Sequence, residues 1–181
     1  MGGLRASILA WVVLSLASQS LAAVRISAYF NNKLLPGDQG STDGSYELLS
    51  LSFSLAQSVS NTPSGIQADM PTQGAVNVLK RGDEWDPNFE TLELYGSSNG
   101  LDTVVLSMQT LSGSGNLVPI FNITLNNVFI TSNQFSLQSG SQETYAFSLN
   151  YEAIVATYYE YDASGAQITE SQTPSYNFAL Q

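Results

Sequence analysis

The clearest pattern in the chain is an alternation of apolar and polar side chains between residues 117 and 161. Large apolar residues recur at every second position in one run: Tyr145, Phe147, Leu149 and Tyr151. This period is typical of a β-strand with one buried face. The run 121–130 alternates in the same way but breaks at Asn126 and Asn127, which predicts a bulge. Residues 132–142, rich in Ser, Gln and Gly, are predicted to connect the two strands as a hairpin.

Shorter alternating runs predict further strands at 24–30, 46–59, 76–78, 104–108 and 176–180. In the run 46–59 we expect one large apolar face toward the core, made of Leu49, Leu51, Phe53 and Leu55. The opposite face is small and uncharged, which suits packing against another subunit: Ser50, Ser52, Ser54 and Ala56. Residues 61–74 contain two Pro, two Gly and no hydrophobic period, so they are predicted to form a long loop.

One short α-helix is predicted over about residues 87–95. Asp86 is a favourable N-cap, and Pro87 occupies the first helical position, where the missing N–H costs nothing. Phe89, Leu92 and Tyr95 fall on roughly one face of this helix. The chain is therefore predicted to be mainly β, with a single helix.

Residues 1–22 have the pattern of a secretory signal peptide: a short basic start, an apolar run at 6–17, and small residues at Ser20 and Ala22. The apolar run is shorter than the roughly 20 residues that span a bilayer, although an uncleaved anchor is the alternative. We expect cleavage after Ala22 or Ala23. The product is one domain, residues 23–181, in the bacterial periplasm or medium and without membrane contact.

Charge and composition exclude several classes of function. The chain has 5 Lys and Arg against 15 Asp and Glu, and removal of Arg5 with the signal peptide moves the formal charge from −10 to −11. Nucleic acid is not an expected partner, because five cationic side chains cannot neutralise a row of phosphates. The absence of both His and Cys excludes Ser–His–Asp and Cys–His catalysis and the usual zinc sites.

Carboxylate chemistry remains. A glycosidase needs two facing carboxyl groups with separated pKa values, and the densest acidic set is Asp83, Glu84, Asp86, Glu90 and Glu93. The alternative is structural, because the helix dipole favours acidic residues near a helix N-terminus. A second set has acidic residues but not the spacing of an EF-hand calcium loop: Asp38, Asp43 and Glu47. We therefore assign no catalytic, cofactor-binding or metal-binding residue and expect no enzyme.

Four tyrosines suggest a surface on which sugars could stack: Tyr151, Tyr158, Tyr159 and Tyr161. The alternative is again structural, because Tyr is a favoured strand residue.

The order of these motifs resembles the Hcp (haemolysin co-regulated protein) family, the tube-forming subunits of the bacterial type VI secretion system. The resemblance rests on the strand 46–53, the helix start Lys80…Asp83…Pro87-Asn88-Phe89, the strands 121–130 and 143–151, and the turn 162–165. It implies a flattened β-barrel of two antiparallel sheets with one helix. It also implies self-association into hexameric rings, which stack into tubes whose lumen can carry small effector proteins.

Three functions follow as expectations. The leading one is an exported structural subunit that forms hexameric rings. The alternative is a secreted monomeric module that binds carbohydrate or protein through the tyrosines and residues 61–74. The third is a carboxylate-based glycosidase, which is supported only by the acidic cluster.

Overall fold

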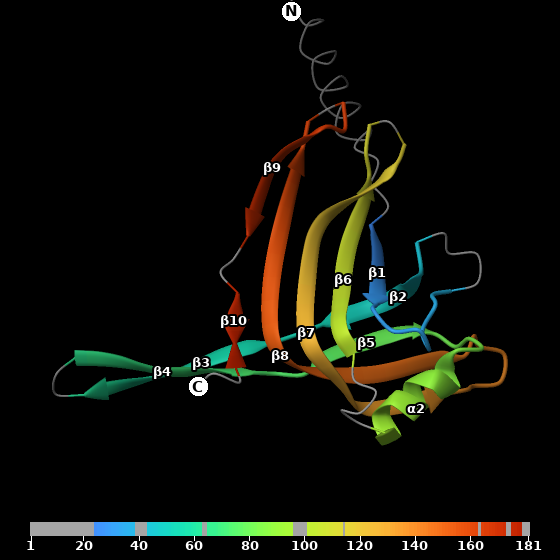
Figure 1. The fold of residues 1–181 in the computed structure, drawn as a ribbon, viewed down its shortest axis with the longest axis horizontal. Coiled ribbons are helices and arrows are strands. Elements are labelled where there is room, and N and C mark those ends of the chain that lie inside the picture. Colours follow the sequence, from blue (N-terminus) through green and yellow to red (C-terminus); the bar gives the residue numbers. More distant parts are fainter. Residues whose placement is uncertain are drawn as a thin grey trace, which may run out of the picture.

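The computed structural model describes residues 24–38, 43–62, 65–95, 101–113, 115–162, 164–172 and 175–178. Two long strands, β7 (Leu117–Ser136) and β8 (Thr144–Tyr161), form the hairpin around which the barrel is built (Figure 1). Their pairing extends from Phe121↔Tyr158 to Ser136↔Thr144, which confirms the predicted hairpin. The connection is shorter than predicted, because residues 132–136 continue as strand and pair with β8.

Six strands close the barrel. β8 pairs with β5 (Val76–Arg81), followed in order by β2 (Ser45–Ser52), β1 (Arg25–Phe30) and β6 (Leu101–Leu111). β6 then pairs with β7, and β7 returns to β8, so the antiparallel pairings form a closed ring. A closed ring leaves no edge strand along the middle of the wall. The predicted mainly β, barrel-like fold is confirmed.

Three further pairings lie outside this ring. β9 (Gln167–Gln172) and β10 (Tyr176–Asn177) pair with the C-terminal half of β8. β9 was not predicted, and the closing strand predicted at 176–180 is described only at its first two residues and at Phe178. β3 (Leu55–Thr62) and β4 (Gly65–Gln73) form a separate two-stranded sheet.

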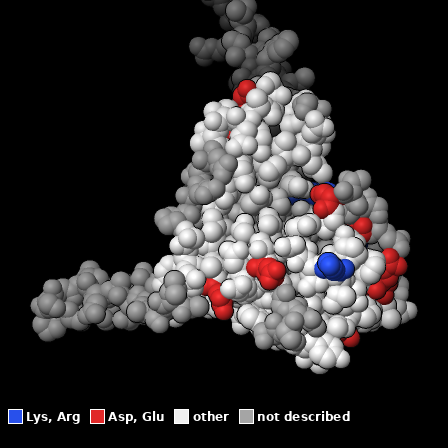
Figure 2. Space-filling model, viewed as in Figure 1, with Lys and Arg blue, Asp and Glu red and all other residues white. Residues whose placement is uncertain are grey.

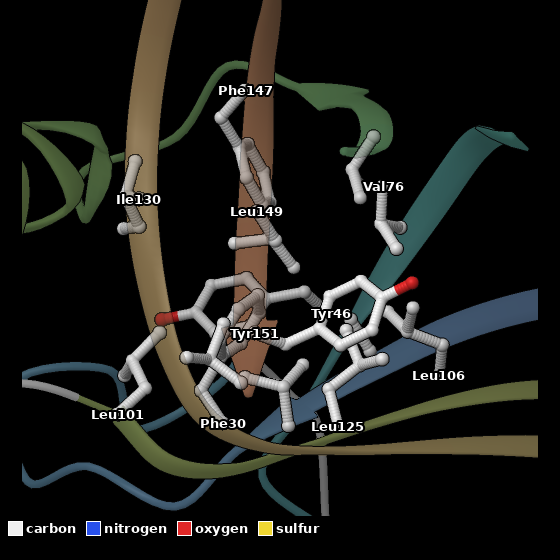
Figure 3. Packing of buried hydrophobic residues seen from close by; sticks show 14 of the residues in the cluster. Phe30, Tyr46, Val76, Leu101, Leu106, Leu125, Ile130, Phe147, Leu149 and Tyr151 are labelled. Carbon is white, nitrogen blue, oxygen red and sulfur yellow. The ribbon is translucent and has the colours of Figure 1, made fainter. Parts of the chain in front are cut away.

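The barrel core is centred on aromatic rings. Phe89 of the helix contacts both Phe30 and Phe147, at centroid distances of 5.2 and 4.9 Å, and Tyr46 adds an edge contact to Phe89 at 5.5 Å. Such tilted and edge-on pairs add stability beyond the area they bury. Figure 3 shows the aliphatic residues that fill the space around them, contributed by β5, β6, β7 and β8, among them Val76, Leu106, Leu125, Ile130 and Leu149.

The helix α2 (Asp86–Tyr95) matches the predicted one and closes one end of the barrel, near the β7–β8 turn (Figure 1). Phe89 and Leu92 are buried, whereas Tyr95 is 65% exposed and does not join the inward face as expected. The capping also differs from the prediction. Oδ1 of Asp83 accepts the Trp85 N–H at 2.8 Å, and Oδ2 of Asp86 accepts the Asp83 N–H at 3.1 Å. Asp83 and Asp86 therefore bind each other's end of the turn that leads into the helix, an arrangement similar to a capping box.

The predicted inward face of residues 49–55 is wrong. The inward side chains of β2 are Tyr46 and Leu48, and the register with β5 shifts between Leu48 and Ser50. Leu49 therefore points outward by the ordinary alternation that follows Tyr46 and Leu48. The bulge then turns Leu51 inward, but β2 ends at Ser52, before Phe53 and Leu55. Leu51 alone packs partly against the core, and the three other predicted core residues are exposed: Leu49 (43%), Phe53 (43%) and Leu55 (51%).

The loop predicted at residues 61–74 is also wrong, because most of it lies in the β3–β4 hairpin. These strands pair only with each other, so the barrel interior does not impose a hydrophobic period on them. Pro71 lies beside a register shift between Gln57 and Val59, a position where a strand tolerates proline.

Candidate assembly surface

Residues 49–56 form an exposed segment without any charge, made of the end of β2, the two residues after it and the start of β3. All eight side chains are exposed except Leu51, which is partly buried. Leu49, Phe53 and Leu55 are large and apolar, whereas the serines between them are small. On the face drawn in Figure 2, acidic groups are likewise separated by broad uncharged areas. Large apolar side chains on an exposed, uncharged strand mark a contact surface. We call residues 49–56 the uncharged strand.

The uncharged strand leads into the β3–β4 hairpin, which projects from the side of the barrel (Figure 1). At its base, the Gly74 N–H donates to the Ser54 carbonyl at 2.9 Å. A Cβ at Gly74 would lie 2.2 Å from Oγ of Ser54 and 3.1 Å from its carbonyl oxygen, so a larger residue would require the Ser54 side chain to move. An isolated two-stranded hairpin is marginally stable in water. The projection therefore favours contact with another protein surface.

A buried lysine fixes the end of the barrel on which the helix lies. Nζ of Lys80, in a side chain only 1% exposed, contacts Oδ2 of Asp83 at 2.6 Å and Oδ1 of Asp86 at 2.7 Å. It also donates to the Arg81 carbonyl at 2.9 Å. Nζ lies 5.5 to 5.7 Å from the ring centroids of Tyr46, Phe89 and Tyr145. The charge is thus held by two carboxylates and three ring faces, which offsets its loss of hydration.

Similar proteins agree with this architecture. A family model described as "Type VI secretion system effector, Hcp" matches residues 36–158, well over half of the chain. The chain belongs to the Hcp family.

Solved Hcp structures have the same fold at low sequence identity. A structure described as a type six secretion system protein superposes with a TM-score of 0.74 at 14% identity, covering 87% of this chain and 98% of that one. Hcp1 from Salmonella typhimurium gives 0.62 at 14% identity, with 87% and 97% covered. The secreted protein Hcp3 from Pseudomonas aeruginosa gives 0.58 at 13%, with 87% and 98% covered. No curated protein matches the sequence.

The Hcp-like motif at the start of the helix is the Lys80 cluster. Its Lys-x-x-Asp spacing brings Lys80 and Asp83 together, and Asp86 joins them from the first turn of α2. The spacing of this motif is readable in the sequence, but the burial of the lysine is not, because its cross-strand partner Tyr145 comes from a distant part of the chain.

The acidic set predicted for a glycosidase is not brought together as a catalytic pair. Asp83 and Asp86 are bound to Lys80, and the carboxylate of Glu93 accepts a hydrogen bond from Nδ2 of Asn133 on β7. Glu84 and Glu90 are exposed. These contacts tie the helix to the barrel, in line with the structural interpretation of the cluster.

The acidic residues considered for calcium accept hydrogen bonds from nearby residues of their own turn. Oδ1 of Asp43 accepts both the N–H and the hydroxyl of Ser45, at 3.1 and 2.6 Å, and Oδ2 of Asp38 accepts the Glu47 N–H at 2.6 Å. Burial raises the pKa of Asp38, and the nearby Asp83 carboxylate adds to this rise, whereas the Glu47 N–H opposes it. Within the part of the chain that the structure describes, no group of acidic side chains has the arrangement of a metal site.

The four tyrosines do not form one platform. Tyr151 is buried in the core and packs edge-on against Phe178, with centroids 5.8 Å apart. Tyr158, Tyr159 and Tyr161 instead line a shallow cavity of about 310 Å³ at the end of the barrel opposite the helix.

The predicted signal peptide, residues 1–22, lies outside the described residues. Among the residues that are described, no helix has the length and apolarity needed to cross a membrane.

Proposed function

We propose that this Hcp-family chain is an exported structural subunit that assembles into hexameric rings, which can stack into tubes. Its role is mechanical rather than catalytic, and the ring lumen carries small effector proteins. Residues 1–22 act as a cleaved signal peptide and direct the mature chain to the periplasm or the medium.

The uncharged strand carries this proposal. Three large apolar side chains would stay in water on a monomer: Leu49, Phe53 and Leu55. Burial of such side chains is worth about 1.5–3 kcal/mol each. The hairpin β3–β4 continues directly from this strand and provides further unpaired strand edges. We take the partner to be a second copy of the chain, because each molecule is always in the presence of other copies.

Net charge opposes association. The mature chain has a formal charge of −11 once Arg5 is removed, so copies repel one another at low ionic strength. Salt screens this repulsion with a Debye length of about 8 Å at 0.15 M. Association through an uncharged surface should therefore strengthen with salt, whereas a surface held by ion pairs would weaken.

Light scattering coupled to size exclusion tests the proposal at low and physiological salt. We expect a mass six times that of one chain. A larger fraction of the protein should have this mass at the higher salt concentration. Phe53→Asp and Leu55→Asp should reduce it toward one chain. Leu94→Asp is the matched control, because Leu94 is 82% exposed on α2, away from the uncharged strand.

A mass of one chain at every salt and protein concentration would reject the ring. The secreted monomeric binding module would then be the better description. An oligomer that survives both substitutions would keep self-association but reject the uncharged strand as its contact.

A further inference from the structure

The main hairpin opens at the end of the barrel opposite the helix. The last pair between β7 and β8 is Phe121↔Tyr158. Beyond this pair, residues 117–119 of β7 pair only with β6, and residues 159–161 of β8 pair only with β9. The β6–β7 tip and the β8–β9 tip consequently diverge (Figure 1). We call the space between them the fork.

Both walls of the fork are strand edges. In a continuous sheet, the edge of residues 117–120 would bond to residues 159–162, yet no backbone hydrogen bond joins these segments in the described structure. Backbone N–H and C=O groups need partners wherever they are shielded from water. Pro119 lies on the β7 wall, and proline within a sheet is confined to edge strands and bulges. The fork therefore presents two edges that face one cavity.

The side chains of the fork are apolar and acidic. Its cavity of about 310 Å³ is lined by Leu111, Val118, Ile120, Tyr159 and Tyr161, together with Glu160. Asp162 also lines it, but its Oδ1 accepts the N–H and hydroxyl of Ser164 and the N–H of Ala166, at 2.6 to 2.9 Å. The Glu160 side chain is exposed and makes no hydrogen bond or ion pair with the described residues. No Lys or Arg lines the cavity.

We propose that the fork binds a short extended peptide segment of another protein, one that alternates apolar and basic residues. The segment adds a strand between β7 and β8, so that its backbone bonds to both edges while its basic side chain meets Glu160. Addition of a strand to an exposed edge is a common mode of peptide recognition, in which the main chain supplies affinity and side-chain pockets supply specificity. The cavity is at the small end of the usual range for ligand sites, so it suits a few residues.

The direct test uses a fluorescein-labelled hexapeptide that alternates lysine and valine, with anisotropy as the readout of binding. A peptide with glutamate in place of lysine tests charge, and one with N-methylated valines removes backbone donors. We expect binding of the lysine peptide only. Hydrogen exchange on the same complex should show new protection of the amides in residues 117–121 and 159–162.

Glu160→Lys should weaken binding of the lysine peptide at least tenfold and create binding of the glutamate peptide. Glu90→Lys is the matched control, because it makes the same charge change at an exposed position on α2, at the opposite end of the barrel. It should leave both affinities within twofold of the parent protein.

Three results would overturn the proposal. The first is no binding of any peptide at millimolar concentration. The second is equal binding of the N-methylated peptide, because main-chain pairing would then have no part. The third is protection of the fork amides by a soluble oligosaccharide, or by raising the concentration of the protein alone. Either of these would show a sugar, or a second copy of the chain, as the occupant instead.

Discussion

Asn127 on β7 donates a hydrogen bond from Nδ2 to Oε2 of Glu152 on β8, at 2.6 Å. Asn127 also has a positive φ of 49°, in the left-handed region that asparagine tolerates better than most residues. The pair lies at the bend of the long hairpin.

Both strands change their inward phase at this pair. On β7 the buried positions pass from Ile123 and Leu125 to Val128, and on β8 they pass from Tyr151 to Ile154. The pairing register is the same on either side, and it slips only later, between Ile130 and Ser132. The bulge predicted at residues 126–127 is therefore wrong: the pairing continues without a shift, and the two strands bend together. Because of this bend, the two halves of the hairpin form two different parts of the barrel wall.

Replacement of Asn127 separates backbone strain from the hydrogen bond. Asn127→Gly loses the bond to Glu152 but accepts the positive φ, whereas Asn127→Val loses the bond and strains the backbone. We expect the valine variant to be less stable than the glycine variant by about 1–2 kcal/mol, the cost of the left-handed region for a residue with a Cβ. Urea unfolding at one protein concentration measures this difference. Equal midpoints would mean that the bend does not require the left-handed conformation.

Removal of the buried lysine should be costly. Lys80→Met leaves Asp83 and Asp86 without their cation beside three aromatic rings, and breaking a buried ion pair from one side costs about 3–5 kcal/mol. Lys33→Met is the control, because Lys33 is exposed and surface substitutions usually stay within about 0.5 kcal/mol. Denaturant unfolding compares the two. A further Asp86→Asn substitution should recover part of the loss, and no recovery would count against this account.

Local patterns predicted the strands that have one buried and one open face. The alternation at 145–151 was sufficient because these residues line the barrel interior, as Tyr145 and Leu149 do. It failed at residues 49–55 because the inward phase of β2 is set by Tyr46 and Leu48, which leaves Leu49 outside, and because β2 ends at Ser52, before Phe53 and Leu55. It missed the end of β3 and all of β4, because these two strands pair only with each other and do not line the barrel.

The candidate surfaces were less predictable than the fold. The uncharged serines at 50, 52 and 54 suggested a contact face, but not that Leu49 and Phe53 would share the exposure. The fork could not be predicted from the sequence, because it depends on the residue at which the pairing between β7 and β8 ends. Residues 117 and 159 are distant in the chain, and only the ladder that ends at Phe121↔Tyr158 relates them.

Two phenylalanines test the corrected inward face. Phe147 is 2% exposed and contacts the rings of Phe89 and Tyr145, so Phe147→Ala should cost about 3–5 kcal/mol. Phe53 is 43% exposed, so Phe53→Ala should cost less than about 1 kcal/mol in the monomer. Denaturant unfolding of both variants under dissociating conditions decides between the predicted and observed faces. Similar losses at the two positions would restore Phe53 to the core.

Cleavage of the signal peptide stays a prediction. The small residues Ser20 and Ala22 occupy the positions that signal peptidase inspects. The intact mass of the exported protein should correspond to a chain that begins at Ala23 or Val24. A product that retains Met1 would instead indicate an uncleaved anchor.

Alkaline pH should unfold the protein through its buried tyrosines. Burial raises the pKa of Tyr46, Tyr145 and Tyr151, and the carboxylates of Glu90 and Asp86 raise that of Tyr145 further. A pKa that is higher in the folded state contributes stability that is fully present below the ordinary value of about 10. That contribution is lost as pH rises above 10, because the unfolded chain then releases protons that the folded chain retains.

Tyr145→Phe isolates one of these groups. The Tyr145 hydroxyl is buried without a hydrogen-bond partner among the described residues, so its removal should be neutral or stabilising at pH 7. Above pH 10, each buried tyrosine should lower the free energy of unfolding by about 1.4 kcal/mol per pH unit. Above pH 10, the free energy of unfolding of Tyr145→Phe should therefore fall less steeply with pH than that of the parent protein. The two slopes should differ by up to about 1.4 kcal/mol per pH unit. Urea midpoints from pH 8 to 11, with phenolate absorbance followed in parallel, measure both effects. An unchanged slope would show that Tyr145 ionises within the folded barrel, and that its hydroxyl reaches water.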